Sequence, residues 1–296
     1  MTRIAFLACE TTLPGNTDRR RGDAYEHDLM MAALEPAFAE RGLELVVIDW
    51  EAPLEAFDDI TLAMLGTAWN YQDKPPEFLA RLEALEDGGV KVCNPPEIVR
   101  WNMTKTYLRG LAEAGAATIP TLWRSDVTRD TLAEAFEHFD TEKLVVKRQV
   151  GAGALDQILV SRGALPDRDW NFGHRAMIQP YLPSIASKGE LSFIFIDGEL
   201  SHALRKRAAE GDYRIQSLYG GVEEDYSPSE NEVAAARNVL DAIPFAPPLY
   251  SRIDMLVDDD GAALVMEAEL IEPYLYPEQG PQVGEHLATA VEKRIG

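Results

Sequence analysis

The stretch that decides the fold runs from residue 252 to residue 269 and reads RIDMLVDDDGAALVMEAE. Two runs rich in β-forming residues flank Asp260-Gly261, a dipeptide typical of a two-residue hairpin turn. Such a turn places Asp254 directly opposite Glu267, with Glu269 on the same face one pleat further along. The opposite face is apolar and carries Ile253, Met255, Val257, Leu264, Met266 and Ala268. The stretch therefore predicts three converging carboxylates on one side of a hairpin and a core surface on the other.

The negative charges of three carboxylates on one face must be neutralised or otherwise stabilised. Directly opposed side chains lie roughly 5 Å apart at Cβ, and like charges at that distance repel. Either the acids share a proton and have raised pKa values, or they hold a hard divalent cation such as Mg²⁺, which prefers oxygen ligands. A hairpin edge that faces solvent is the third interpretation, because the whole chain is acidic. The alternation of acids with apolar residues favours a binding site.

Composition narrows the class of protein. The chain has 296 residues, 46% of them hydrophobic, which is ample for one large or two to three small domains. A net charge of −22 disfavours nucleic acid or an anionic membrane as the main partner. No apolar run reaches the roughly 18 residues of a membrane span, and two cysteines fit a reducing cytoplasm. We therefore expect a cytoplasmic protein whose main partner is neither nucleic acid nor a membrane, with a homodimer as the expected oligomer from general frequency.

The order of elements predicts an α/β part followed by α+β parts. Residues 3–9, 43–49, 60–65 and 90–93 read as strands and alternate with helices at 25–41 and 76–87, which indicates an open α/β layer. Beyond Asn94-Pro95-Pro96 we expect a helix capped by Asn102 and ending at Gly115. A second hairpin turns at Asp197-Gly198. A capping box begins a helix at Ser229, and a terminal helix covers roughly 284–295. We expect antiparallel hairpins here, not βαβ units.

Basic residues and glycines suggest where an anion binds. Lys147 ends a strand beside the glycine loop 151–154, which suits contact with phosphate, although an exposed lysine at a strand end is equally compatible. A Rossmann fingerprint fails because position 156 is Asp, and no Walker A sequence is present. The densest basic stretch, residues 204–216, is either an anion site or a protected sheet edge. We find no histidine spacing for a metal and no nucleophile motif.

In this order, the motifs resemble the ATP-grasp ligases. They are Asn102-Met103-Thr104-Lys105, Val146-Lys147, the glycine loop, Gln179-Pro180-Tyr181, Gly189-Glu190, the basic run from 205, Asp254 and Glu267-x-Glu269. The run from Arg205 to Gly221 is similar to the branch of glutathione synthetase and ribosomal protein S6 modification. The segments 67–71 and 267–273 are similar to the branch of the D-cycloserine-forming ligase. The resemblance spans nearly the whole chain, and its specificity lies in the ordered combination.

The resemblance implies a fold and a set of roles. The fold is an α/β pre-ATP-grasp domain (1–97) followed by two α+β lobes (98–182 and 183–296) that clasp ATP. Contacts to the nucleotide are implied for Lys105, Lys147, Gly151, Gly153, Gln179, Tyr181, Leu182 and Glu190. The metal ligands implied are Asp254, Glu267 and Glu269, for two Mg²⁺ ions with Mn²⁺ as an alternative. The implied catalytic residues are Lys206 and Arg214. Many family members end the acidic motif in Asn where this chain has Glu269, which leaves the metal geometry open.

The implied reaction is activation of a carboxylate by ATP to an acyl phosphate, followed by attack of an amine or related nucleophile and release of ADP and phosphate. This chemistry suits a sequence with lysines, arginines and acids and no nucleophile, because phosphoryl transfer depends on positioning and charge stabilisation. A cyclising ligase of the D-cycloserine-forming type is the related alternative. A non-catalytic nucleotide-binding protein and a phosphotransferase are alternatives from other classes.

Overall fold

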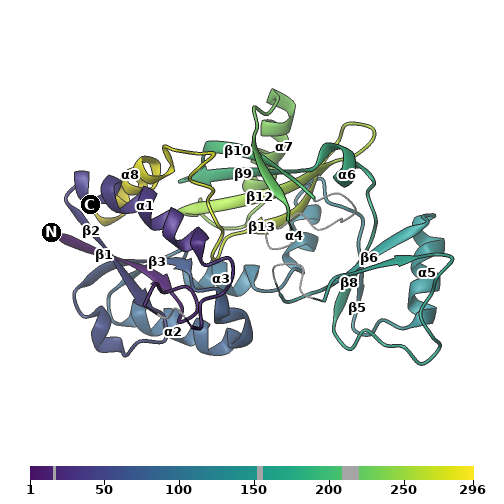
Figure 1. Ribbon diagram of the computed structural model, residues 1–296, viewed down its shortest axis with the longest axis horizontal. Helices are drawn as coiled ribbons and strands as arrows, with labels where there is room; N and C mark the ends of the chain where they lie inside the picture. The colour runs from purple at the N-terminus through teal and green to yellow at the C-terminus, as the bar shows by residue number, and fades with distance from the viewer. Residues whose placement is uncertain (16–17, 152–155, 209–219) are drawn as a thin grey trace.

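The computed structural model describes residues 1–15, 18–151, 156–208 and 220–296. These residues form three β-sheets (Figure 1): a parallel layer at the left, a five-stranded sheet at the upper centre and a smaller sheet at the right. The predicted combination of an α/β layer with antiparallel α+β parts is confirmed. In the described part of the chain, no helix is both long enough and apolar enough to cross a lipid bilayer.

The N-terminal layer is a parallel sheet with helices on both faces. Across the sheet, its strands are β2 (Leu43–Asp49), β1 (Thr2–Ala8), β3 (Ile60–Thr67) and β4 (Lys91–Cys93). The helical segments are α1 (Tyr25–Glu40), η1 (Leu54–Phe57), η2 (Trp69–Asp73) and α2 (Pro75–Asp87). Alternate residues of β1 supply two separate cores, because neighbouring side chains on a strand point to opposite faces.

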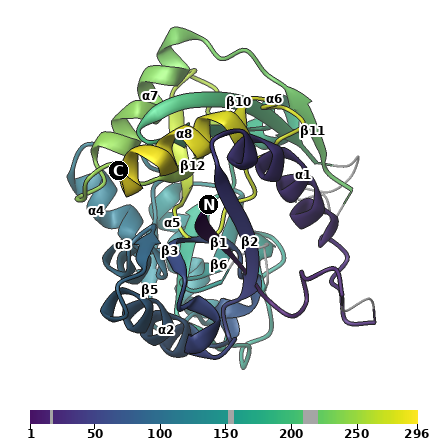
Figure 2. The same ribbon diagram turned by 90° about the vertical axis from the view of Figure 1, so that its left-hand side faces the viewer.

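The C-terminal helix α8 (Val283–Ile295) covers one face of this layer, although the chain before it belongs to the five-stranded sheet. Figure 2 shows α8 beside α1, and the two helices share a core in which Leu34 and Phe38 meet Leu287 and Val291. Their close approach depends on Gly284, because a Cβ there would collide with the carbonyl oxygen of Ala33. The last helix thus completes the core of the first layer.

The five-stranded sheet is antiparallel and carries the acidic hairpin. In order across the sheet, its strands are β11 (Val222–Asp225), β10 (Glu199–Arg207), β9 (Glu190–Ile196), β12 (Tyr250–Val257) and β13 (Ala263–Glu269). The helices α3 (Pro96–Asn102), α4 (Tyr107–Glu113), α6 (Ser184–Lys188) and α7 (Glu230–Asp241) accompany it. Apolar residues of α4 and α7 pack against Phe193, Ile253 and Met255 on one face.

The smaller sheet is also antiparallel. Its strands, in order, are β5 (Leu122–Arg124), β8 (Ala176–Pro180), β6 (Lys143–Arg148) and β7 (Ile158–Ser161), and the helix α5 (Arg129–Phe139) accompanies them. Leu132 and Phe136 of α5 pack against Leu144 and Val146. Figure 1 shows this sheet standing apart from the N-terminal layer.

Buried hydrogen bonds join the N-terminal layer to the five-stranded sheet. The amide nitrogen of Asn94, just beyond β4, donates to the carbonyl oxygens of Tyr250 at 2.9 Å and Leu270 at 2.6 Å. Its amide oxygen accepts from the backbone N–H of Leu249 at 2.7 Å. Because the Asn94 side chain is fully buried, this seam fixes the position of the hairpin relative to the first layer.

The hairpin differs from the prediction near its turn. The predicted two-residue turn at Asp260-Gly261 is wrong: the backbone N–H of Asp258 bonds to the carbonyl of Ala262 at 2.9 Å, and Val257 pairs with Ala263. A bulge between Asp254 and Met255 then restores the expected pairing of Asp254 with Glu267. In consequence Ala263 and Val265 pack against the core in place of Leu264 and Met266.

Asn102 has a different role from the one predicted. It ends α3 instead of capping one long helix, and α4 begins separately at Tyr107. Its side chain donates to the carbonyl oxygen of Ala268 at 2.8 Å and accepts from the backbone N–H of Leu270 at 3.0 Å. Asn102 therefore fixes the end of β13 against the segment that carries Lys105. The capping box of Ser229 and Glu232 is confirmed.

Candidate active site

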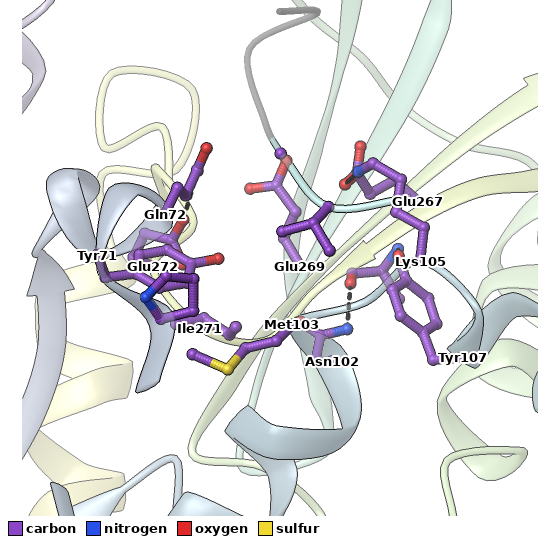
Figure 3. A pocket seen from close by; sticks show the side chains of 14 residues that line it. Tyr71, Gln72, Asn102, Met103, Lys105, Tyr107, Glu267, Glu269, Ile271 and Glu272 are labelled. Carbon is purple, nitrogen blue, oxygen red and sulfur yellow. Dashed lines mark hydrogen bonds and ion pairs between the residues drawn. The ribbon is translucent and has the colours of Figure 1, made fainter. Parts of the chain in front are cut away.

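A pocket lies where the N-terminal layer meets the end of β13 (Figure 3). One wall comes from η2, another from the connection between α3 and α4, and a third from the residues of and after β13. The lining residues are Tyr71, Gln72, Pro75, Asn102, Met103, Lys105, Tyr107, Val150, Gly151, Glu267, Ala268, Glu269, Ile271 and Glu272. Four residues predicted from the sequence meet here: Lys105, Gly151, Glu267 and Glu269.

The two glutamates of β13 point into this pocket. Glu267 and Glu269 are two residues apart on one strand, so both side chains leave the same face. Lys105 Nζ contacts Glu267, and the backbone N–H of Lys105 bonds to the carbonyl of Gln149 at 2.7 Å. Burial raises the pKa of Glu269 to about 7, and the neighbouring acids Asp254 and Glu267 add to the effect, while Arg252 opposes it.

Asp254 is paired with Glu267 across β12 and β13, does not line the pocket, and is held by protein donors. Its carboxylate accepts from Ser192 Oγ at 2.5 Å and Lys206 Nζ at 3.3 Å, and Arg252 Nε is 3.1 Å from both of its oxygens. Burial favours the neutral acid, but Arg252, Lys206 and these hydrogen bonds outweigh it and lower the pKa of Asp254. Asp254 is therefore a buried anion with two cationic partners.

Arg252 connects the two acids. It contacts Glu269 as well as Asp254, and it donates to the carbonyl oxygen of Tyr274 at 3.2 Å. Burial alone would lower the pKa of Arg252, but Asp254 and Glu269 raise it, so the side chain stays charged. Arg252 was not among the residues predicted from the sequence. Its position two residues before Asp254, on the same face of the strand, is the signal that could have identified it.

Lys206 forms a buried ion pair with Glu190. Its Nζ lies 2.7 Å from Glu190 Oε1, and both side chains are almost fully buried. The two residues are paired across β9 and β10, because a bulge near His202 shifts the register of this hairpin by one residue. Burial raises the pKa of Glu190 to about 7 despite Lys206. Burial opposes the charge of Lys206, but Asp254 and Glu190 raise its pKa.

Lys147 belongs to the same electrostatic environment. It lies near the end of β6 and is paired with Met177 of β8. Burial lowers its pKa; Glu267 and Glu190 raise it, and Lys105 lowers it. Lys105 and Lys147 therefore both interact electrostatically with Glu267. Lys105 belongs to the connection between α3 and α4, and Lys147 belongs to the smaller sheet. An anion that entered between them would meet two ammonium groups.

The remaining predicted residues lie outside the pocket lining or outside the described residues. The Gln179 side chain donates to Thr121 Oγ1 at 2.9 Å, and the backbone N–H of Tyr181 bonds to the carbonyl of Lys143 at 2.9 Å. Gln179 lies within β8, and Tyr181 and Leu182 lie in the connection from β8 to α6; none of the three lines the pocket. Gly153 and Arg214 lie outside the described ranges.

Glu272 is a further acid of the pocket, and its role was not predicted. Its Oε1 accepts from Gln72 Nε2 at 3.4 Å (Figure 3), and its carbonyl oxygen accepts from Trp69 Nε1 at 3.2 Å. Burial raises the pKa of Glu272 to about 8, and Glu269 adds to the shift. The sequence did offer one signal for Glu272, because it follows Glu267 and Glu269 in an acidic motif. The residues that hold it in position, however, come from η2.

The residues of the site fit a metal ion only in part. Glu267 and Glu269 offer carboxylate oxygens to the pocket, which are the ligands that Mg²⁺ prefers. Asp254 is engaged by Arg252, Lys206 and Ser192. Among the described residues, no group of three or more His, Cys, Asp or Glu side chains is arranged to hold a metal. The predicted set of three ligands thus stays a prediction, with Glu267 and Glu269 as its better-placed members.

Comparison with known proteins supports the class that the motifs suggested. Residues 4–94 match the family model of the N-terminal domain of D-cycloserine synthetase DcsG. Over 266 residues the chain is 28% identical to the cycloserine biosynthesis protein DcsG of Streptomyces lavendulae, covering 84% of this chain and 88% of that protein. The crystal structure of D-cycloserine synthetase DcsG superposes with a TM-score of 0.82 at 24% identity and covers 99% of this chain and 100% of the other.

A second solved structure carries the cofactors expected of the class. The ATP-grasp ligase PsnB, in complex with a precursor variant, Mg and ADP, superposes with a TM-score of 0.65 at 17% identity, covering 100% of this chain and 99% of that chain. The chain thus has the fold of the ATP-grasp ligases. Its sequence similarity to DcsG supports an ATP-grasp ligase of that kind. Within that class, its resemblance to the D-cycloserine-forming branch is confirmed by the match of the N-terminal layer and by the full-length superposition.

Proposed function

We propose that this protein uses ATP and Mg²⁺ to activate the carboxylate of a small amino-acid-like molecule as an acyl phosphate. An amine or related nucleophile then displaces phosphate, and ADP and phosphate are released. The observation that carries this proposal is the meeting of Lys105, Glu267 and Glu269 in one pocket between the N-terminal layer and the five-stranded sheet. Such a site supplies charge for phosphate and oxygen ligands for a cation, as phosphoryl transfer requires.

The two lysines bind the phosphates of ATP in this proposal. Lys105 and Lys147 both interact with Glu267, so a polyphosphate placed among them would replace a carboxylate as their partner. Gly151 lines the same pocket with a backbone φ of 135°, a conformation that favours glycine. Gly153 belongs to the same loop in sequence. Gln179, Tyr181, Leu182 and Glu190 would contact the nucleoside.

Glu267 and Glu269 would hold magnesium, with Asp254 as the third acid. We propose two ions, with Mn²⁺ as an alternative. Bound there, the metal would neutralise phosphate oxygens during transfer. Supporting this, burial raises the pKa of Glu269 to about 7, and a cation would offset the cost of its buried negative charge.

Arg252 and Lys206 supply fixed positive charge behind the acids. Both side chains are buried, and both contact Asp254. A preorganised cation in a site that excludes water stabilises developing negative charge without the cost of reorienting solvent. We therefore propose that they stabilise the transferred phosphoryl group and the acyl centre, together with Arg214.

The proposed division of the chain follows the sheets. The parallel sheet falls within 1–97, the smaller sheet within 98–182 and the five-stranded sheet within 183–296. Across these boundaries, α4 packs on the five-stranded sheet and α8 on the first layer. A cytoplasmic location and a homodimer remain part of the proposal.

The test is ADP release in magnesium buffer with a panel of D- and L-amino acids. The wild-type protein should turn over with at least one of them. Glu267→Gln and Lys147→Ala should each lower kcat by about 100-fold or more, because each removes a charge that acts on the transferred group. Glu134→Gln on the exposed face of α5 makes the same chemical change as Glu267→Gln outside the pocket and should match the wild type. Wild-type turnover in Glu267→Gln would reject the site assignment.

The likeness to D-cycloserine synthetase favours intramolecular ring closure as a second candidate. The mass of the product separates the two reactions. Ring closure yields a product one water lighter than a single substrate, whereas ligation joins two molecules with loss of one water. Phosphorus NMR of the same mixture should show free phosphate for either ligase and a phosphate ester for a phosphotransferase.

A further inference from the structure

The three glutamates of the pocket differ in what neutralises them. Glu267 contacts Lys105, and Glu269 contacts Arg252. Glu272 accepts a hydrogen bond from the amide of Gln72 and interacts electrostatically with the phenol of Tyr71, and both of these partners are neutral. Within the described ranges, no Lys, Arg or His nitrogen lies within 4.0 Å of Glu272 in an ion pair. Of these three acids, Glu272 is therefore the one that forms no ion pair with a cationic side chain in the described part of the chain.

Glu272 is also held in place by its surroundings. Trp69 Nε1 binds its carbonyl oxygen at 3.2 Å, and the guanidinium of Arg21 lies over the Trp69 ring at 4.9 Å from the centroid. On either side, Ile271 and Pro273 are buried. A carboxylate whose backbone is fixed in this way is preorganised, so it can bind a ligand without a large cost in conformational entropy.

Its position divides the pocket into two ends. Figure 3 shows Glu272 beside Tyr71 and Gln72 at one side, Glu269 in the middle, and Glu267 with Lys105 at the other side. Anionic groups are favoured at the lysine end. A small molecule that carries both a carboxylate and a protonated amine would be oriented by the pair of ends, with its amine toward η2.

We infer that Glu272 binds the protonated amino group of the small-molecule substrate and so selects amino acids over uncharged or hydroxy analogues. The inference rests on the proposed ligase function. A metal ion is a poorer occupant here, because in the described residues Glu272 joins no group of three acids, histidines or cysteines that could hold one. The neutral partners Gln72 and Tyr71 orient the carboxylate without cancelling its charge, which suits recognition of a cation.

The experiment measures binding by calorimetry to protein saturated with Mg²⁺ and a non-hydrolysable ATP analogue. The probes are the amino acids of the ADP-release panel and, for each, the hydroxy acid in which a hydroxyl replaces the amine. Four proteins are compared: wild type, Glu272→Gln, Glu272→Asp and Glu113→Gln. Glu113 is exposed on α4 and outside the pocket, so it controls for the same chemical change.

The wild type and Glu113→Gln should bind at least one amino acid much more tightly than its hydroxy acid. In Glu272→Gln, affinity for that amino acid should fall by on the order of 30-fold or more, which is the scale for truncating one partner of a buried charge pair. The affinities of this variant for the hydroxy acid and for the ATP analogue should stay within about twofold of the wild-type values. A change that small does not indicate the loss of a contact. Glu272→Asp keeps the charge and should retain the preference at intermediate affinity.

Two results would overturn the inference while leaving the ligase proposal intact: an undiminished preference in Glu272→Gln, or a parallel loss of nucleotide affinity in that variant. A wild-type nucleotide complex that binds no amino acid of the panel would count against both the inference and the proposed substrate class. Failure of the wild type to bind the ATP analogue at all would instead reject the proposed function.

Discussion

Replacing Lys206 with methionine tests whether the buried charges behind the pocket form one interdependent unit. Lys206 Nζ lies 2.7 Å from Glu190 and 3.3 Å from Asp254, and the lysine is 5% exposed. Asp254 keeps Arg252 and Ser192 in the variant, whereas Glu190 loses its partner. Removing one member of a buried pair typically costs about 3–5 kcal/mol, because the other charge is left uncompensated. We expect Lys206→Met to lose about that much stability, mainly through Glu190.

The dependence of the free energy of unfolding on pH follows from the raised pKa of Glu190, which is about 7 in the wild type. An acid whose folded pKa is raised binds its proton more tightly in the folded state, so stability falls as pH increases toward that pKa. Without Lys206 the pKa of Glu190 should rise further. The loss in Lys206→Met should thus be larger at about pH 8 than at about pH 6, and Glu190→Gln in the same chain should remove this difference.

Urea unfolding followed by circular dichroism gives the free energies for the wild type, the two single variants and the double variant. We expect the double variant to recover about 2 kcal/mol relative to the sum of the single losses, a coupling typical of residues in contact. A coupling free energy of zero, or a Lys206→Met variant within about 0.5 kcal/mol of the wild type at both pH values, would refute the reasoning.

Three further changes test other parts of the structure. Asn94→Ala removes three buried hydrogen bonds between the first layer and the five-stranded sheet and should cost about 2–4 kcal/mol in urea unfolding; an unchanged midpoint would contradict this role. Gly284→Ala forces α8 away from Ala33 and should cost about 1–3 kcal/mol, and a melting temperature equal to that of the wild type would argue against the close contact. The pKa of Glu272 is raised by burial to about 8, so wild-type stability should decline from about pH 4.3 to about pH 8, and Glu272→Gln should flatten part of this decline; parallel pH curves would count against a buried acid.

Much of the fold followed from local pattern. The strands and helices of the first layer, the Asp197-Gly198 hairpin and the capping box at Ser229 all depend on neighbours in sequence, and they were predicted close to their observed bounds. The acidic hairpin was predicted with its central pair correct and its turn wrong. The Asp258 side chain accepts a hydrogen bond from the backbone N–H of Ala262 at 2.8 Å, and this favours a longer turn than the dipeptide rule expects.

The site was harder to predict because its geometry depends on distant segments. Lys105, Glu267 and Glu269 could be proposed from motif order, and they do line one pocket. The contacts of Arg252 with Asp254 and Glu269 lie within the hairpin, so local pattern could have supplied them, but the motif order drew attention only to the acids. Glu272 is positioned by Gln72, 200 residues earlier, and a motif confined to the C-terminal hairpin carries no trace of that partner.

The pairing of α1 with α8 sets an order of events for a nascent chain. Residues such as Met30 and Leu34 leave the ribosome with the first layer, whereas Leu287 and Val291, which cover them, belong to the last helix. Until that helix is synthesised, one face of the parallel sheet stays exposed to solvent, and chaperones and proteases can reach it. The parallel sheet is therefore synthesised well before the helix that completes its core.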